Sequence, residues 1–498
     1  MRIQLSDHFT YKRLLRFTIP SIIMMICTSV YSIVDGLFVS NYVGTTPFAA
    51  LNLMMPLLMG ISTVGFMIGT GGSAVVAIKL GEGEREKANE YFSMLIYILI
   101  GAGITVAVTA IIFMRPIAYA IGATDDMIEY CVMYGRILCV SLTGFMLQIA
   151  FQSFFIVAEK PELSLKMSLL SGITNVILDY LFIVVFGWGL AGAGAATAVG
   201  EILGGFCPIL YFSRENNSLL RLGKTRFHGR VLLKTCTNGS SELMTNISSS
   251  IVNILYNYQL MRLAGEDGVA AYGVIMYVTF IFAAVNIGYS IGSAPVVSFH
   301  YGAGNRTELK NIFRKSVIVI GSAGVVMTFL AELLAYPMTR VFVGYDPELF
   351  AMTCHGFRLY AISFLLSGFN IWGSGFFTAL GDGAVSASIS FLRTLVFQVS
   401  VVMILPVFLK LDGIWLAIVA AELLALLVTA AFLVKKRKKY CPGFLPGSIF
   451  LGSAEAVQQR QDCPFIPLPE PRWNPRRSSR LWRFPLSSLP RTPSESCP

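Results

Sequence analysis

Long apolar stretches separated by short polar loops run through most of the chain. We count twelve of them, at about residues 14–39, 47–78, 91–114, 127–158, 163–186, 190–212, 238–262, 269–298, 315–336, 350–380, 385–409 and 412–434. A helix of about 20 apolar residues crosses a bilayer, so each stretch predicts one transmembrane helix. The longer stretches predict helices that tilt, bend or project beyond the bilayer.

Positive charge is unevenly divided between the two sides that these twelve crossings define. If the N-terminus lies inside, the inner segments carry most of the lysines and arginines, including residues 435–439, Lys-Lys-Arg-Lys-Lys. The outer loops hold only Arg115, Arg262, Arg340 and Lys410. Lysine and arginine favour the cytoplasmic side of a membrane, so we expect both termini in the cytoplasm. The net charge of +10 therefore indicates membrane orientation and does not suggest a nucleic-acid partner.

The two halves of the chain repeat each other at an offset near 221 residues. The matching positions are Gly72-Ser73-Ala74 with Gly292-Ser293-Ala294, Gly81, Gly83 and Arg85 with Gly302, Gly304 and Arg306, and Gly192 and Glu201 with Gly413 and Glu422. Six crossings return the chain to its starting side, so both halves have the same orientation. They are then related by an axis along the membrane normal.

These patterns predict an all-α polytopic membrane protein with twelve transmembrane helices in two parallel-repeat six-helix lobes. The first lobe is expected at residues 1–212 and the second at 238–440, joined by a basic cytoplasmic linker at 213–237. Residues 441–498 differ in kind, because they hold 11 of the 21 prolines and no lysine. We expect this Pro/Arg/Ser-rich tail to be disordered.

Composition excludes several classes of protein. The chain is 55% hydrophobic and 13% charged, against about 25% charged in soluble domains. The nine cysteines form no C-x-x-C pair and the four histidines are scattered, so we expect no metal centre, disulfide framework or cofactor. Gly223-Lys224-Thr225 imitates the end of a phosphate-binding loop, but Ser218 stands where that loop requires glycine. ATP is not indicated, and an ion gradient is the expected energy source.

Two isolated aspartates are the strongest candidates for function. Asp35 is the only charged residue among the 62 from Phe17 to Ile78, and Asp179 is the only one from Met167 to Gly200. A carboxylate at the centre of a membrane helix costs roughly 2.5–3.5 kcal/mol on insertion scales. A functional role therefore explains Asp35 and Asp179 better than a tolerated defect does. A purely structural role as a helix cap or hydrogen-bond partner stays open for both.

Other polar residues share helix faces with these aspartates. Residues four apart lie on one face of a helix, which pairs Tyr31 with Asp35, Asn175 with Asp179 and Thr197 with Glu201. We expect these pairs to form one polar cluster in the first lobe. For Thr197 and Tyr31, simple packing is nearly as good an explanation. Pro20 lies inside the first span, where it removes a backbone hydrogen bond and is expected to bend the helix.

Such a cluster suits ion coupling. Burial and a neighbouring carboxylate both favour the protonated form of a carboxyl group, so an aspartate here can load and release a proton. Alternatively, the oxygens of Asp35, Asn175, Asp179 and Thr197 can hold Na⁺. In the second half the equivalent positions carry no carboxylate, so coupling is expected in the first lobe.

Three further acids occupy the spans or their ends. Glu242, at the start of span seven, is a possible second-lobe acid, although solvation at the membrane edge explains it almost as well. Glu201 and Glu422 are equivalent in the repeat, which favours a structural role such as pairing with a buried arginine or with a helix end. Arg393 is a candidate partner for one of them.

Taken together, the motifs resemble those of the multidrug and toxic compound extrusion (MATE) transporters over about residues 10–438, with the DinF/MepA-like branch as the nearest type. The matching motifs are Pro20…Tyr31…Asp35-Gly36-Leu37-Phe38-Val39, Gly81-Glu82-Gly83 with Gly302-Ala303-Gly304, Asn175-x-x-x-Asp179 and Gly192-x-Gly194-x-Ala196-Thr197. The resemblance implies a V-shaped pair of six-helix lobes and cation-driven antiport that exports amphipathic, often cationic drugs.

The resemblance also implies particular site residues. In the DinF-like branch, the proton or sodium site matches Asp35, Asn175, Asp179 and Thr197, with Tyr31 adjacent and Pro20 as the helix bend. The NorM-like branch also uses an acid on helix ten, but residues 350–380 contain none. A NorM-type second-lobe site is therefore not expected.

Further implications concern partners and localisation. We expect a multi-pass monomer in the cytoplasmic membrane of a bacterium, with H⁺ or Na⁺ as coupling ion and small amphipathic substrates as partners.

Other functions are less well supported. A lipid-linked oligosaccharide flippase shares the broader fold, but it favours basic residues in the first-lobe cavity, where the sequence offers none. A major-facilitator carrier also has twelve spans, yet residues 80–85 lack that family's Gly/Asp/Arg loop signature. An aspartyl enzyme built on Asp35 and Asp179 is the remaining alternative, and we expect no enzyme activity.

Overall fold

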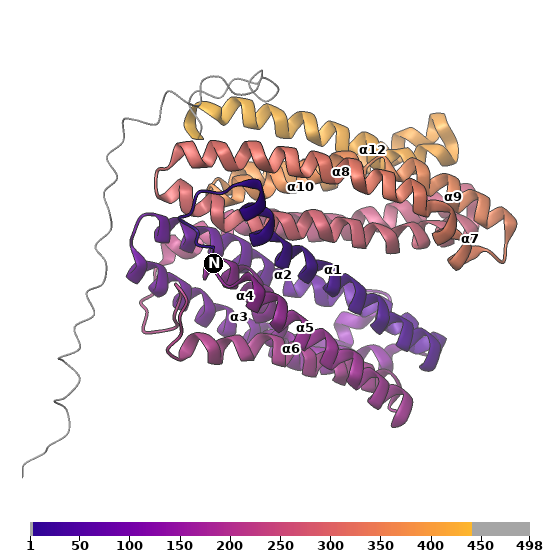
Figure 1. Ribbon diagram of the computed structural model, residues 1–498. Coiled ribbons are helices and arrows are strands. Elements are labelled where there is room, and N and C mark those ends of the chain that lie inside the picture. The colour runs from indigo at the N-terminus through magenta and orange to yellow at the C-terminus, as the bar shows by residue number, and fades with distance from the viewer. Residues whose placement is uncertain (1–2, 441–498) are drawn as a thin grey trace, which may run out of the picture. The chain divides into compact units, whose positions relative to one another are not determined.

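The computed structural model describes residues 3–440, and every regular element in that range is a helix. The first half comprises α1 (Tyr11–Tyr42), α2 (Thr45–Gly81), α3 (Arg85–Ala120), α4 (Ile128–Val157), α5 (Pro161–Asp179), the π-helical turn η1 (Tyr180–Val185) and α6 (Gly189–Ser213). The second half comprises α7 (Gly229–Gly302), α8 (Arg306–Val343), α9 (Pro347–Ala361), α10 (Phe364–Ala379), α11 (Gly383–Phe391), the π-helical turn η2 (Leu392–Phe397) and α12 (Gln398–Tyr440) (Figure 1). The expected disordered tail at 441–498 lies outside the described residues.

The count of membrane spans follows from where the long helices turn back. Within residues 3–440, nine helical runs are long and apolar enough to cross a membrane, and the bent pair α9–α10 makes a tenth. The helical run of α7 reverses at Gly265, and the run from α11 to α12 reverses at Lys410. Each of these two runs therefore supplies two spans. The described residues form twelve, as the apolar pattern predicts.

The two reversals have unusual backbone geometry. Gly265 has φ 64° and ψ −150°, a conformation that glycine adopts easily because it lacks a Cβ atom. Lys410 has φ 51° and ψ −126°, and a residue with a side chain is strained there by about 1–3 kcal/mol. Both fall between the apolar stretches predicted from sequence.

Three breaks in the helices are not predicted by the apolar pattern. The span expected at 350–380 is divided into α9 and α10, whose axes differ by 47°. In spans five and eleven, the chain widens into π-helical turns, η1 directly after Asp179 and η2 around Arg393. Hydrophobic periodicity cannot reveal these changes, because an apolar run is compatible with a continuous or a broken helix. π-Turns are frequent at functional sites.

Helix α4 is the centre of the first lobe. The most apolar window of α4 is 83% buried, against 39% or less for the other candidate spans in the described range. It packs against α2, α3 and α6. Its ring cluster with neighbouring helices consists of Phe92, Phe151, Phe154, Phe155 and Phe212. Any polar side chain that α4 directs at α6 is therefore held by a well-packed helix.

The two lobes meet through glycines that are related by the repeat. A Cβ atom added at Gly81 would lie 2.0 Å from the carbonyl oxygen of Phe299, and one at Gly302 would lie 2.1 Å from that of Ile78. Gly239 of α7 packs in the same way: a Cβ atom added there would lie 2.0 Å from the carbonyl oxygen of Met67 in α2. Only glycine permits such approach. We call the end of the bundle that carries loops 82–84 and 303–305 the closed face, because these contacts hold the lobes together there.

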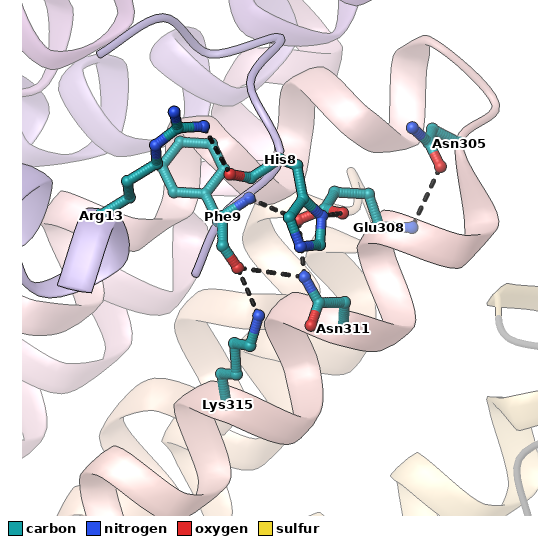
Figure 2. A network of polar contacts seen from close by, with 7 residues as sticks. All are labelled: His8, Phe9, Arg13, Asn305, Glu308, Asn311 and Lys315. Carbon is teal, nitrogen blue, oxygen red and sulfur yellow. Dashed lines mark hydrogen bonds and ion pairs between the residues drawn. The ribbon is translucent and has the colours of Figure 1, made fainter. Parts of the chain in front are cut away.

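The segment before α1, residues 3–10, also ties the lobes together at the closed face. Leu5 and Phe9 are fully buried. The backbone N–H of Leu5 donates to Oε1 of Glu159 (2.7 Å), which follows α4. The backbone N–H of Phe9 donates to Oε1 of Glu308 (2.9 Å), at the start of α8. Figure 2 shows the second-lobe side of this network, in which His8 also contacts Glu308 (2.6 Å).

Candidate functional site

The two isolated aspartates come together inside the first lobe. Asp35 lies on α1 and is 8% exposed, and Asp179 is the last residue of α5 and is fully buried. Their carboxyl groups are near enough to influence each other electrostatically. Among the described residues, three of these carboxylate oxygens have no hydrogen-bond partner: both oxygens of Asp179 and Oδ1 of Asp35. The ion pairs of the described residues include neither aspartate. The site therefore offers free acceptors at membrane depth.

Close packing of α5 on α6 positions the amide and hydroxyl groups beside these acids. A Cβ atom at Gly200 would lie 3.0 Å from the carbonyl oxygen of Ser171, so glycine lets the two helices approach. One turn away, the Asn175 side-chain amide donates to Oγ1 of Thr197 (3.2 Å). The Asn175 carbonyl oxygen is buried without a partner in the described residues. It adds a third kind of oxygen acceptor to the site.

Tyr31 connects α1 to α5. Its ring lies against Gly172, where an added Cβ atom would be 2.9 Å from the ring. This contact fixes α1 against α5 one helical turn before Asp35. The structure thus brings five of the sequence-predicted residues into one region, the aspartates directly and Tyr31, Asn175 and Thr197 around them.

Helix α4 adds residues that sequence reasoning did not single out. The Ser141 hydroxyl donates to Oε2 of Glu201 on α6 (2.5 Å). The Tyr134 hydroxyl is buried without a partner in the described range, in electrostatic range of Asp35, Asp179 and Glu201. Nothing in the sequence marks Ser141 or Tyr134, because serine and tyrosine are common in apolar helices. Their role follows only from packing.

Glu201 does not have the partner that was expected. A buried arginine, suggested as one possible partner, does not pair with Glu201 in the described residues: its carboxylate accepts from Ser141, and no ion pair there includes it. Glu201 therefore joins Asp35 and Asp179 as a third acid without a cation. Three neighbouring acids without a cation favour the binding of a proton or another positive charge in this region.

The cluster is not a conventional metal centre. Within residues 3–440 no group of three or more His, Cys, Asp or Glu side chains is arranged to hold a metal ion. The oxygens of Asp35, Asn175, Asp179 and Thr197 are hard acceptors of the kind that bind a proton or an alkali cation. Pro20 lies about four turns before Asp35, within the continuous helix α1.

Glu242 lies apart from the first-lobe cluster. It is half-buried in the first arm of α7, and no ion pair of the described residues includes it. Asn238, one turn earlier, donates to the carbonyl oxygen of Thr378 (2.8 Å) in α10. Glu242 is thus close to where α7 joins the two lobes. Unlike Asp35 and Asp179, it is not paired with a second acid in the described residues.

In the second lobe, the residue equivalent to Glu201 is Glu422, which forms an ion pair with Arg393. Nη2 of Arg393 donates to Oε1 of Glu422 (2.7 Å), and Nε donates to both carboxylate oxygens. The suggested pairing of Glu422 with Arg393 is confirmed. The two lobes therefore share a fold but differ in charge: one holds unpaired acids and the other a neutral pair.

Comparison with known proteins gives a consistent result. A protein-family model described as MatE matches residues 20–181 and 243–404, once in each half. The chain is similar to the multidrug export protein MepA of Staphylococcus haemolyticus (22% identity over 75% of this chain and 82% of that one). It is also similar to MepA of Staphylococcus saprophyticus (21% identity over 84% and 92%).

Solved structures of MATE transporters share the fold. A crystal structure of MATE in complex with MaL6 superimposes with a TM-score of 0.83 at 21% identity, covering 87% of this chain and 98% of that one. An outward-facing multidrug resistance MATE family transporter of the MOP superfamily gives 0.82 at 21% identity, covering 87% and 97%.

Proposed function

The chain belongs to the MatE family, and from that premise we propose that it is a cation-coupled antiporter, which exports amphipathic or cationic drugs in exchange for H⁺ or Na⁺. The relatives named as multidrug export proteins support the substrate class. The family match in both halves and the twelve spans support a transporter built from two lobes.

One observation carries the coupling part of the proposal. Asp35 and Asp179 are buried next to each other at membrane depth, with free oxygens and without a cation partner in the described residues. Two adjacent carboxylates cannot both stay charged cheaply in such a place. The pair therefore stabilises a bound cation or proton. Loading makes the pair less negative by one charge, and release restores that charge, so the lobe has two electrostatic states.

The surrounding residues hold the acids in position. Asn175 and Thr197 link α5 to α6, and Tyr31 fixes α1 against α5. A change in the charge of the aspartates is therefore felt by three helices at once. Helix α1 also packs on α7 of the second lobe, where a Cβ atom added at Gly288 would lie 2.8 Å from the carbonyl oxygen of Ser21. Movement of α1 relative to α5 can therefore reach the second lobe. That gives the ion a mechanical route to the substrate pathway.

Replacement of Asp35 by Asn tests the proposal. The amide has the same shape but cannot carry the charge, so export of ethidium from cells or vesicles is expected to stop while the protein is still made. Asp126→Asn is the matched control, because Asp126 is exposed in the loop before α4. Ethidium export by Asp35→Asn at the wild-type rate would remove Asp35 from the mechanism.

The coupling ion is identified in the same vesicles. An imposed pH gradient without Na⁺ drives export if the coupling ion is H⁺, and a Na⁺ gradient at equal pH drives it if the ion is Na⁺. We further propose that both termini lie in the cytoplasm, on the basis of the lysine and arginine distribution. A protease that cuts the termini only from the cytoplasmic side would support that orientation.

A further inference from the structure

A ring-sized cavity lies in the second lobe, away from the carboxylate cluster. Its volume is about 200 Å³, and a cavity of about 150 Å³ is enough to hold benzene. The walls come from both arms of α7, from α9 and α10, and from η2 and α12. Its apolar lining includes Tyr256, Tyr272, Met276, Phe280, Tyr360 and Phe364. The space suits one aromatic ring with a small substituent.

The Arg393–Glu422 ion pair forms part of the lining. Glu422 has no acceptor to spare: its Oε1 receives Nε and Nη2 of Arg393, and its Oε2 receives Nε of Arg393 and the Asn370 side-chain amide (2.7 Å). Arg393 still has capacity, because no hydrogen bond of the described residues uses its Nη1 group. The pair therefore presents a donor to the cavity, and it presents no free carboxylate.

Tyr256 supplies a second free polar group. It is 2% exposed, and its hydroxyl is buried without a partner in the described part of the chain. Its ring stacks on that of Tyr272 at 5.1 Å with an angle of 6° between planes. The Tyr272 hydroxyl is already used, since it donates to Oδ1 of Asn253 (3.1 Å). A buried hydroxyl without a partner is costly, which is a reason to expect a ligand atom beside it.

The charges determine which ligand group is accepted. Arg393 and Glu422 neutralise each other, so the cavity attracts neither cations nor anions strongly. Nη1 of Arg393 and the Tyr256 hydroxyl can both donate, and an arginine cannot accept. A ligand atom placed between them must therefore be a hydrogen-bond acceptor. In the first-lobe cluster, by contrast, the free carboxylate and amide oxygens of Asp35, Asp179 and Asn175 are acceptors.

From this geometry we propose that the second-lobe cavity is a binding subsite for an uncharged aromatic ring that carries a carbonyl oxygen. The oxygen accepts from Arg393 and Tyr256, and the ring lies against the stacked tyrosines. The protein then has two chemically distinct sites, one for cations and one for neutral acceptors. The inference concerns equilibrium binding, so it does not depend on the proposed export.

Fluorine NMR on the purified full chain in lipid nanodiscs tests the subsite with two ring-matched probes. 4-Fluorobenzamide offers a carbonyl oxygen, and 4-fluorobenzylammonium offers only a cation. The wild type is expected to bind the benzamide, and Tyr256→Phe is expected to weaken this binding about tenfold. Arg393→Lys keeps a positive partner for Glu422 but lacks the free Nη1 group, so it is expected to weaken binding as well.

Tyr289→Phe is the matched control. Its hydroxyl donates to Ser316 (2.8 Å) in the same lobe, but Tyr289 does not line the cavity. This variant is expected to bind 4-fluorobenzamide like the wild type. The proposal is overturned if the wild type does not bind the benzamide, if Tyr256→Phe binds it unchanged, or if the ammonium probe binds equally well in a Tyr256-dependent way.

Discussion

Replacing Gly239 by Ala should open the closed face. The new methyl group would lie 2.0 Å from the Met67 carbonyl oxygen, and backbone atoms on both helices cannot move aside as a flexible side chain could. Such overpacking typically costs about 1–3 kcal/mol. This cost exists only while α7 and α2 are in contact. It therefore raises the free energy of the conformation closed at this face and leaves a conformation with separated lobes unaffected.

The expected size of the effect follows directly. Since about 1.4 kcal/mol changes an equilibrium tenfold, the ratio of open to closed molecules should rise by about 5-fold to 150-fold. Spin labels on exposed Glu86 and Thr307, near the two loops of the closed face, report this change as a longer distance in pulsed electron resonance.

A second glycine of α7, on the arm that follows the reversal at Gly265, provides the control. Gly273 has no atom within 4 Å of an added Cβ, so Gly273→Ala is expected to keep the wild-type distance distribution. The reasoning about lobe contact is refuted if Gly239→Ala also keeps that distribution, or if both variants shift it equally.

Three further predictions concern stability, measured as the shift in thermal unfolding of the purified protein in detergent. Phe9→Ala should destabilise it by about 3–5 kcal/mol, because the fully buried ring is lost, and an unchanged midpoint would mean that the segment 3–10 is not docked. Glu422→Gln should cost about 3–5 kcal/mol by leaving the partly buried Arg393 without its charge partner, and an unchanged midpoint would contradict the ion pair. Lys410→Gly should stabilise by about 1 kcal/mol by relieving φ 51°, whereas a lower midpoint would argue against strain there.

Hydrophobic pattern predicted the number of spans well, because a bilayer requires each crossing to be long and apolar. The reversals at Gly265 and Lys410 fall in the gaps of that pattern. The division of span ten and the π-turns at 180–185 and 392–397 could not be predicted, since they change backbone geometry without changing which residues are apolar.

The candidate site was predictable where charge is conspicuous. Asp35 and Asp179 stand out because no other charge surrounds them, and spacing of four residues correctly grouped Asn175 with Asp179 on one face. Which neighbour Glu201 binds was not predictable. The equivalence of Glu201 and Glu422 suggested equal partners, but in the described residues Glu422 pairs with Arg393, whereas Glu201 accepts from Ser141.

The segment before α1 is the largest feature that the sequence analysis missed. Residues 3–10 are polar and short, so they resemble a free terminus. Their importance comes from long-range contacts of Leu5 and Phe9 with Glu159 and Glu308, which no local pattern encodes.

Drug-driven ion movement in proteoliposomes shows directly whether the buried Asp35–Asp179 pair couples ion entry to drug export. With a drug gradient as the only driving force, the wild type should carry H⁺ or ²²Na⁺ in the opposite direction, and Asp126→Asn should do the same. Asp179→Asn should move no ion, because the buried pair with Asp35 can no longer load and release charge. Ion countertransport by Asp179→Asn at the wild-type rate would contradict the account.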